Sequence, residues 1–515
     1  MKNNRFSQKI TAFHGRKTPE EGILVGYAAI INAFVLSMPL PDRLSLISFK
    51  NRRYQTDTWQ VYSSRYLPED NLYKQLVFAI RYEGINLLFF KKLFAKLTEK
   101  EITKLVQIKP LGQYCRKIWF LFEWLEEKQL KIPDLKTGNF VSLINQKQQY
   151  GIENGIKSKR HRIVNNLPGA RNYCPLIYKT EKLKKYIKTN VSTQKDNYLK
   201  TIHKDLLQRT AAFLLLKDSK ASFNIEGENP KSKRAARWGR VIGQAGTMNI
   251  NKEELLRLQQ IVIEKNRFVN MGFRQEGGFV GDHDRTSGEP VPQHISARQQ
   301  DLDQLIEGLI ATKNLLLQSE MDAVLIASII AFGFVFIHPF EDGNGRIHRY
   351  LIHHILAKKK FSQQGLIFPV SASILNHIDD YRKVLEKYSL PLLDFIEWGE
   401  TGNHNIEVSN DTIDYYRYFD VTKQAEFLYD CVNDTIKNII PNEIKFLQEY
   451  DEFKNYLDEK FEMPDKMVAL LVRFLEQNNG ILPKRAETKE FSKLTGREVT
   501  EIESKYKEIF REIPK

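Results

Sequence analysis

Hydrophobic residues recur at helical spacing along most of the chain, and this pattern predicts a mainly helical fold. In the first third, amphipathic or apolar stretches predict helices at Ile23–Met38, Leu72–Phe94 and Tyr114–Glu127. Further along, apolar residues three and four apart predict helices at Tyr198–Ser222 and Ala297–Leu317. We therefore expect an all-α chain in which any sheet is small.

The centre of the fold is predicted at Ala323–Ile337, a nearly uncharged stretch. A helix that is apolar on all sides is buried, so we expect it to lie inside a bundle. By contrast, Phe268–Gln293 is rich in Gly, Asp and Arg, which favours a hairpin or a loop with several turns.

Breaks in the pattern predict three domains, in keeping with a length of 515 residues. A basic, turn-rich stretch at Gln148–Tyr173, which contains KSKRHR, indicates a boundary. We expect a helical N-terminal accessory domain at 1–165, a central domain at 180–400 and a helical C-terminal module at 410–515. Three short stretches there, with glycine turns between them, are compatible with a helix-turn-helix or a plain helical cap: Met467–Leu475, Lys489–Thr495 and Val499–Phe510.

The charge and the cysteines narrow the class of protein. A formal charge of +15 suits an anionic partner such as a nucleotide, a nucleic acid or an acidic protein face, although lysines scattered over solvated helices give the same total. Three widely spaced cysteines without a CxxC pair argue against disulfides and zinc and fit a reducing cytoplasm. The apolar stretch Ile23–Leu36 is shorter than the roughly 20 residues that a bilayer needs, so we expect a buried helix and no membrane partner.

The segment His338–Arg349, HPFEDGNGRIHR, follows the predicted central helix and carries the chemistry. Gly343 and Gly345 have no side chains, so phosphate oxygens can approach the backbone N–H groups where the next helix begins. The Asn344 side chain adds an amide donor in the same turn. The segment therefore predicts a site for an anion.

The charged residues of this segment suit phosphoryl transfer. Arg346 and Arg349 are three apart and share a helix face, and each can hold two phosphate oxygens. Asp342 is a hard oxygen ligand that suits Mg²⁺ beside phosphates. His338 can accept a proton from an attacking hydroxyl near neutral pH. Positioning and charge neutralisation then carry most of the catalysis.

This segment resembles the HxFx(D/E)GNGRxxR signature of the Fic family and not the P-loop pattern, which the chain lacks. Most members of that family transfer AMP from ATP to a protein hydroxyl. The resemblance implies that His338 is the general base, Asp342 the Mg²⁺ ligand and Gly343–Gly345 the cradle for the α- and β-phosphates. It assigns Arg346 and Arg349 to phosphates, the second to the γ-phosphate, and gives Phe340 a packing role.

A second motif upstream, Ser222-Phe-Asn-Ile-Glu226-Gly227, resembles the inhibitory pattern (S/T)xxxE(G/N) of the same family. In that class a helix, here about 205–227, packs beside the active site. A glutamate that pairs with Arg349 occupies the guanidinium that should hold the γ-phosphate. The alternative is an ordinary glutamate near a C-terminal glycine, with Ser222 as a local cap.

Two weaker expectations concern the rest of the nucleotide. The hairpin-like segment 268–293, with Val280 and Gly281, corresponds to the family's flap, which covers the nucleotide and captures the target by adding a strand. Tyr381 falls where relatives have paired aromatics near the adenine. Arg382 departs from that pairing, so specificity for the base is less determined than phosphate handling.

Three hypotheses follow for the function. The first is a protein adenylyltransferase that modifies Ser, Thr or Tyr hydroxyls of target proteins, itself included, and is inhibited by Glu226. The second keeps the site but uses another nucleotide or phosphoryl-linked donor, or removes AMP. The third is a DNA-binding regulator that acts through the C-terminal helices.

Overall fold

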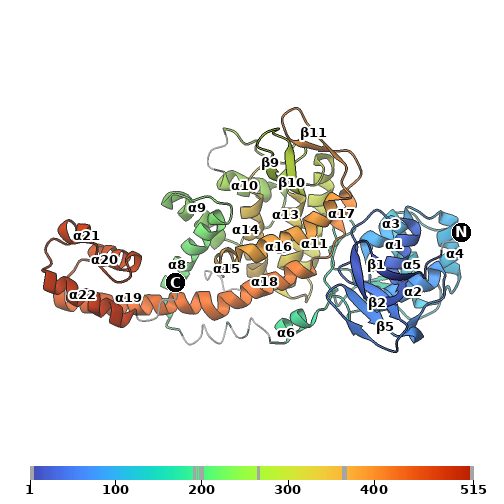
Figure 1. The fold of residues 1–515 in the computed structure, drawn as a ribbon, viewed down its shortest axis with the longest axis horizontal. Coiled ribbons are helices and arrows are strands. Elements are labelled where there is room, and N and C mark those ends of the chain that lie inside the picture. The colour runs from blue at the N-terminus through green and yellow to red at the C-terminus, as the bar shows by residue number, and fades with distance from the viewer. Residues whose placement is uncertain are drawn as a thin grey trace.

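Three parts follow one another along the chain: an N-terminal domain, a helical bundle and a small module at the end of a long helix (Figure 1). The computed structural model describes residues 5–189, 193, 195, 202–263, 267–361 and 368–510. Helices dominate and the sheets are small, so the mainly helical fold is confirmed.

The N-terminal domain begins with a five-stranded sheet, so the expectation of a wholly helical domain there is wrong. The strands are arranged in the order β1-β2-β3-β5-β4, with β3 parallel to β5 and the other neighbours antiparallel. Their bounds are β1 Lys9–Phe13, β2 Arg16–Val25, β3 Leu44–Ser48, β4 Tyr54–Gln55 and β5 Trp59–Tyr62.

The predicted helix Ile23–Met38 divides at Gly26 into the end of β2 and the helix α1, Gly26–Phe34. Gly26 has φ +69, which a side chain disfavours, and a Cβ there would lie 2.1 Å from Oε2 of Glu83. The run before it, Ile23 to Val25, is apolar and suits a buried strand as well as a helix, so periodicity alone could not separate the two.

Four helices complete this domain, together with a second sheet of order β6-β8-β7. The predicted helix Leu72–Phe94 is interrupted at Gly84, which has φ +88, whereas the third predicted helix matches α5. In the part of the chain that the structure describes, no helix has the length and apolar character needed to span a membrane. The bounds are α2 Leu72–Tyr82, α3 Leu87–Phe94, α4 Glu99–Gln107, α5 Gln113–Glu126, β6 Val141–Ser142, β7 Ile156–Ser158 and β8 Ile163–Asn165.

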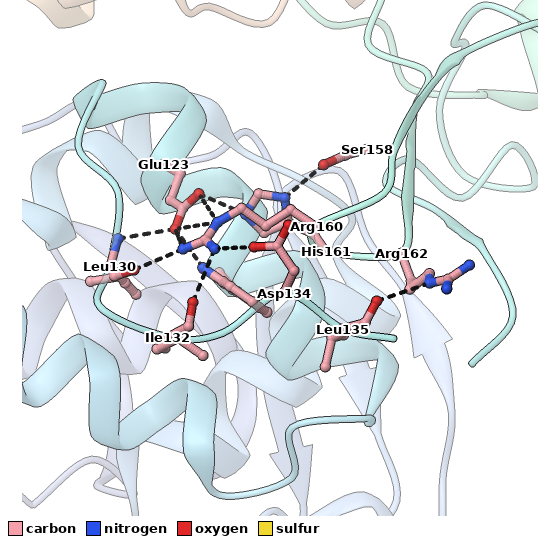
Figure 2. A network of polar contacts seen from close by, with 10 residues as sticks. Glu123, Leu130, Ile132, Asp134, Leu135, Ser158, Arg160, His161 and Arg162 are labelled. Carbon is pink, nitrogen blue, oxygen red and sulfur yellow. Dashed lines mark hydrogen bonds and ion pairs between the residues drawn. The ribbon is translucent and has the colours of Figure 1, made fainter. Parts of the chain in front are cut away.

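A polar network around Glu123 of α5 fixes the turn between β7 and β8 (Figure 2). The Glu123 carboxylate accepts hydrogen bonds from Arg160 at 2.9 Å, from Nε2 of His161 at 3.0 Å and from the Trp119 indole at 2.6 Å. Burial raises the pKa of Glu123, but the hydrogen bonds from His161, Arg160, Trp119 and the Leu130 amide outweigh it and lower the pKa to about 2. The buried carboxylate thus holds the turn as an anion.

The segment after β8 enters the bundle core, although its turn-rich sequence predicts a domain boundary. Tyr173 is fully buried, and its hydroxyl donates to the carbonyl of Ile329 at 2.5 Å. That carbonyl belongs to a π-helical turn, Ser328–Phe332, between the helices α12 (Ala323–Ala327) and α13 (Gly333–Ile337). Gly333 has no room for a side chain beside the Tyr173 hydroxyl. The N-terminal domain and the bundle therefore share one hydrophobic core.

The bundle surrounds the apolar helix α12–α13, as predicted for Ala323–Ile337. The helix predicted at Tyr198–Ser222 is observed from residue 204, and residues 198–201 lie outside the described residues. The bounds are α6 Glu181–Thr189, α8 Lys204–Asn224, α9 Ser232–Gly243, α10 Lys252–Val262, β9 Phe279–His283, β10 Pro290–Ile295, α11 Leu302–Leu317, α12 Ala323–Ala327, α13 Gly333–Ile337, α14 Asn344–Lys358, α15 Val370–Asn376, α16 Ile378–Leu393, β11 Trp398–Glu400, β12 Ile406–Val408, α17 Ile413–Arg417 and α18 Thr422–Asp434.

The C-terminal module has its own hydrophobic cluster, which runs from Phe453 to Phe510. Helices α17 and α18 pack in the core of the bundle instead, so the module begins within α19 and not at 410. The helix predicted at Lys489–Thr495 is also wrong, because the short helix α21 precedes it and turns occupy most of that stretch. The bounds are α19 Ile440–Phe461, α20 Asp465–Gln477, α21 Lys484–Thr488 and α22 Gly496–Ile509.

We expect Glu123→Gln to lower the free energy of unfolding by about 3 kcal/mol at pH 7, because it leaves the Arg160 guanidinium without its buried partner. Since the pKa is depressed in the folded protein, this stabilisation is present above roughly pH 4.5 and is lost as the pH falls towards 2. Urea denaturation followed by circular dichroism measures it.

Asp134→Asn provides the matched control, because Asp134 pairs with the same arginine at 2.5 Å but is 67% exposed. An exposed pair contributes about 0–1 kcal/mol. Equal losses for the two variants would contradict the structural role assigned to Glu123.

Candidate active site

The predicted catalytic segment forms a tight turn between α13 and α14. His338 ends α13 in a left-handed conformation, φ +54, and Gly343 precedes α14 with φ +94. The side chain of Asn344 closes the turn: its amide donates to the carbonyl of Phe340 at 2.7 Å and its oxygen accepts from the Phe340 amide at 3.0 Å. Asn344 is buried, so it shapes the turn and does not present its amide to an anion as expected.

A carboxylate already occupies the predicted anion cradle. A Cβ on Gly345 would lie 2.3 Å from Oε1 of Glu226, so the Glu226 side chain lies directly over the first turn of α14. A helix N-terminus favours negative charge through its free N–H groups and its dipole. The glycine of the motif therefore leaves room for an anion, and in this structure the anion is Glu226.

Arg349 joins the inhibitory motif to the catalytic motif. Its Nη2 donates to Oε1 of Glu226 at 2.7 Å and to the carbonyl of Ser222 at 2.5 Å, while its Nε donates to Oγ of Ser222 at 3.0 Å. Gly227, at φ +74, ends helix α8 in the manner of a C-terminal glycine cap and orients Glu226. Both Ser222 and Glu226 thus contact the arginine expected to bind the γ-phosphate.

Arg346 is surrounded by three carboxylates although only 1% of its side chain is exposed. Its Nε lies 2.8 Å from Oε2 of Glu226, its Nη1 lies 2.8 Å from Oε1 of Glu228, and its Nη2 donates to Oδ1 of Asp342 at 2.9 Å. Glu228 also pairs with Arg234 of α9. Both arginines of the motif are therefore engaged by carboxylates, Arg349 by Glu226 and Arg346 by Glu226, Glu228 and Asp342.

The imidazole of His338 is held in one tautomer. Nδ1 lies 3.1 Å from the carbonyl of Val335, which can only accept, so Nδ1 carries the proton. Nε2, which forms no hydrogen bond within the described ranges, is left as an acceptor. The pKa of His338 is lowered from 6.5 to about 4, mainly by desolvation; the hydrogen bond to the Val335 carbonyl opposes this shift, and the charge of Arg274 adds a smaller lowering. The ring is therefore a neutral base at physiological pH.

Arg274, which the sequence did not single out, supports the turn from the flap side. Its Nε donates to the carbonyl of His338 at 2.8 Å, and its other nitrogens donate to the carbonyls of Glu276 and Ala297. Burial lowers the pKa of Arg274 to about 10. This buried guanidinium fixes the strained backbone at His338 and links it to both ends of the flap.

The residues present fit a magnesium ion that a nucleotide shares. Asp342 is 46% exposed on its side chain, and its Oδ1 accepts from Arg346 and from the Gly343 amide. Oδ2 has no hydrogen bond among the described residues, which leaves one oxygen for a metal. The described residues contain no group of three potential ligands, so protein atoms alone do not form a metal site there. Mg²⁺ held by one carboxylate and substrate phosphates matches this donor set.

The flap is the hairpin of β9 and β10, as predicted for 268–293. Val280 pairs with His294 and is 44% exposed, whereas Gly281 lies so close to β10 that a Cβ would be 2.2 Å from the carbonyl of Val291. The His294 ring attaches β10 to α13 through the Phe336 carbonyl at 2.9 Å. That Val280 and Gly281 contact a nucleotide stays a prediction.

Tyr381 lies behind the phosphate arginine and not at an open position beside a base. It is 5% exposed, its ring packs against His348 and Phe427, and its hydroxyl faces Arg349. The expected role in adenine binding is therefore not supported by its placement. The sequence alone could not show that Tyr381 lies on the face of α16 that packs against the bundle. Arg382, by contrast, is exposed and pairs with Asp379.

The inhibitory helix is anchored by a residue that the sequence reading missed. Asp218 of α8 is fully buried, pairs with Nε2 of His353 at 2.8 Å, and accepts from the amides of Ser371 and Ala372 at 2.6 and 3.2 Å. It thereby joins α8 to α14 and to the N-terminus of α15. The available signal for Asp218 was an acidic residue on the apolar side of a predicted helix. For Glu228 it was a further glutamate two residues after Glu226.

Comparison with known proteins finds a family match to one segment of the chain and two similar solved structures. Residues 249–356, which include the flap and the whole catalytic turn, match the sequence profile described as the Fic/DOC family. The fold is similar to a Fic domain containing signaling protein from Bacteroides thetaiotaomicron, with 16% identity, 50% of this chain and 95% of that chain covered, and a TM-score of 0.36. For a Fic family protein from Desulfovibrio desulfuricans the identity is 16%, the coverage 64% and 86%, and the TM-score 0.37.

We expect the His338 imidazole to remain neutral, with the proton on Nδ1, until the pH falls to about 4. Arg274→Met should raise this pKa towards the ordinary value of 6.5, since it removes a facing positive charge. Arg274→Lys keeps the charge and should shift the pKa less. The measurement is the pH dependence of the ring ¹⁵N shifts in histidine-labelled protein, and an unchanged pKa in Arg274→Met would contradict the assigned electrostatic role.

Proposed function

Because residues 249–356 form a domain of the Fic/DOC family, whose members commonly transfer a nucleoside monophosphate to proteins, we propose that this protein is an adenylyltransferase. It moves AMP from ATP to a Ser, Thr or Tyr hydroxyl of a protein. The proposal rests on one observation: a neutral histidine, His338, and two buried arginines, Arg346 and Arg349, lie close together at the N-terminus of α14.

The transfer step assigns a task to each residue of the turn. The target oxygen attacks the α-phosphorus, its proton passes to Nε2 of His338, and the bond from the α-phosphorus to the pyrophosphate oxygen breaks. Arg346 and Arg349 hold the phosphate oxygens, and the free amides of α14 favour their negative charge. Mg²⁺ bound to Asp342 and the phosphates would neutralise the leaving pyrophosphate.

The resting protein is inhibited in this proposal because carboxylates occupy the phosphate groups' positions. Glu226 pairs with Arg349 and fills the space over Gly345. Glu226 and Glu228 both pair with Arg346. The side chain of Glu226 is 25% exposed, so it can leave the site without unfolding the bundle. Removal of either carboxylate should favour productive nucleotide binding.

We expect Glu226→Gly to raise AMP transfer from ATP roughly 10-fold or more, in line with the 1–3 kcal/mol of typical coupling between sites. His338→Ala in the Glu226→Gly background should lower the rate by roughly 10²–10⁴-fold, because no base accepts the proton. Labelled ATP, Mg²⁺ and a host lysate provide the assay, which is read by intact mass and peptide mapping.

Equal labelling by Glu226→Gly with and without His338 would contradict the proposed function. A panel of nucleotide and phosphoryl-linked donors, read by the mass added to the target, separates AMP transfer from the same site acting on another donor. Loss of AMP from a modified target, with no transfer from any donor, would indicate the reverse reaction.

We expect Glu228→Gln to lower the apparent KM for ATP by a few-fold, because it frees one side of Arg346 while Glu226 still blocks Arg349. Combined with Glu226→Gly, it should increase activity beyond the single variant. Glu276→Gln, a carboxylate in the segment leading to the flap, is the matched control. If Glu228→Gln leaves both the single and the combined rates unchanged, Glu228 is only structural.

A further inference from the structure

The net charge of the protein is confined to its N-terminal domain. Residues 1–180 contain 30 Lys and Arg against 14 Asp and Glu, a net charge of +16, whereas residues 181–515 contain 48 against 49. The C-terminal module, from 465 to 510, has nine basic and eight acidic residues, so it lacks the excess of positive charge typical of a DNA-binding module. The excess positive charge that could attract a polyanion therefore lies in the N-terminal domain.

Within that domain, exposed lysines gather on the loop after α5 and on the β7–β8 hairpin, which the KSKRHR stretch forms. We call these five residues the lysine surface: Lys128, Lys131, Lys136, Lys157 and Lys159. Among residues 5–189 and the other described ranges, none of the five forms an ion pair with a carboxylate.

The carboxylates of the same segments pair with basic residues outside the lysine surface. Glu126 pairs with Lys91 at 3.1 Å, Glu127 with Arg171 at 3.0 Å, and Asp134 with Arg160 at 2.5 Å. Glu153, at the start of the hairpin, faces Lys179. These carboxylates therefore do not neutralise the positive charge of the lysine surface.

Polar contacts join the loop and the hairpin into one rigid surface (Figure 2). The Leu135 amide donates to the Arg160 carbonyl at 3.0 Å, and Arg162 donates to the carbonyls of Leu135 and Lys136 at 3.2 and 2.5 Å. Lys157 and Arg162 both lie over the ring of Phe140, at 5.5 and 5.3 Å. The buried Glu123 network behind them therefore orients cations and does not merely stabilise the domain.

We propose that the lysine surface binds the phosphate backbone of a nucleic acid. Lysine is depleted in protein–protein interfaces, which use aromatic and apolar anchors, but it is the ordinary partner of backbone phosphates. Ile156, 71% exposed, is the only large exposed hydrophobic residue recorded among the described residues of the loop and hairpin, too little for a membrane anchor. The inference does not depend on the proposed transfer activity.

The test uses full-length protein and fluorescein-labelled 20-base-pair duplexes of DNA and of RNA, together with a single strand of equal length. Fluorescence anisotropy is followed against salt. Five phosphate contacts give a slope of log K against log salt of about −4.5. Lys131→Glu/Lys157→Glu/Lys159→Glu should weaken binding at least roughly 10-fold and reduce the slope by about 3. The comparison among the three probes identifies the nucleic acid.

The control variant, Lys466→Glu/Lys489→Glu/Lys493→Glu, changes the net charge equally at exposed positions of the C-terminal module and should bind like the wild type. Equal weakening by both variants, or no binding at low salt, would overturn the proposal. Binding to phosphatidylserine vesicles or polyglutamate without binding to nucleic acid would overturn it as well. Unchanged circular dichroism shows that each variant is folded.

Discussion

Two buried guanidinium groups at the start of α14 determine how this active site is organised. Arg346 and Arg349 are at most 2% exposed, and a buried charge is stable only with a partner of opposite sign. In the structure that partner is the carboxylate pair at the end of α8. Phosphate groups offer the same charge and the same bidentate geometry. Under the proposed function, ATP and these carboxylates compete for the same two arginines, and the burial of the arginines accounts for the inhibition.

The rest of the bundle fixes the backbone on either side of these arginines. Tyr173 packs against Gly333 in the middle of the central helix, and Arg274 holds the left-handed turn at His338 through carbonyls from three segments. Asp218 fixes the inhibitory helix to the same scaffold. As a result the base, the arginines and the inhibitory carboxylate are positioned by neighbouring elements of one core. The N-terminal domain shares that core, and its lysine surface and the candidate active site lie on different elements.

Local pattern predicted the helical character of the bundle, the buried central helix and the flap hairpin, because each rests on a periodicity or a glycine content visible within a short window. It failed at Gly26 and at Gly84, where a single left-handed residue divides an apolar run. It also failed between Gln148 and Tyr173, where polar turns are followed by a buried segment. Contacts with residues distant in sequence decide these positions, and no local window contains them.

The motif His338–Arg349 by itself determined which side chains the candidate site contains and predicted their roles: a base, a metal carboxylate, a glycine cradle and two arginines for phosphates. Tertiary structure decided what those groups face. It assigned the Asn344 amide to the turn, placed Tyr381 behind Arg349, and added Glu228, Arg274 and Asp218 from other elements. The physical reason is that chemistry is a property of single side chains, whereas burial, tautomer and charge pairing depend on which side chains the fold brings together.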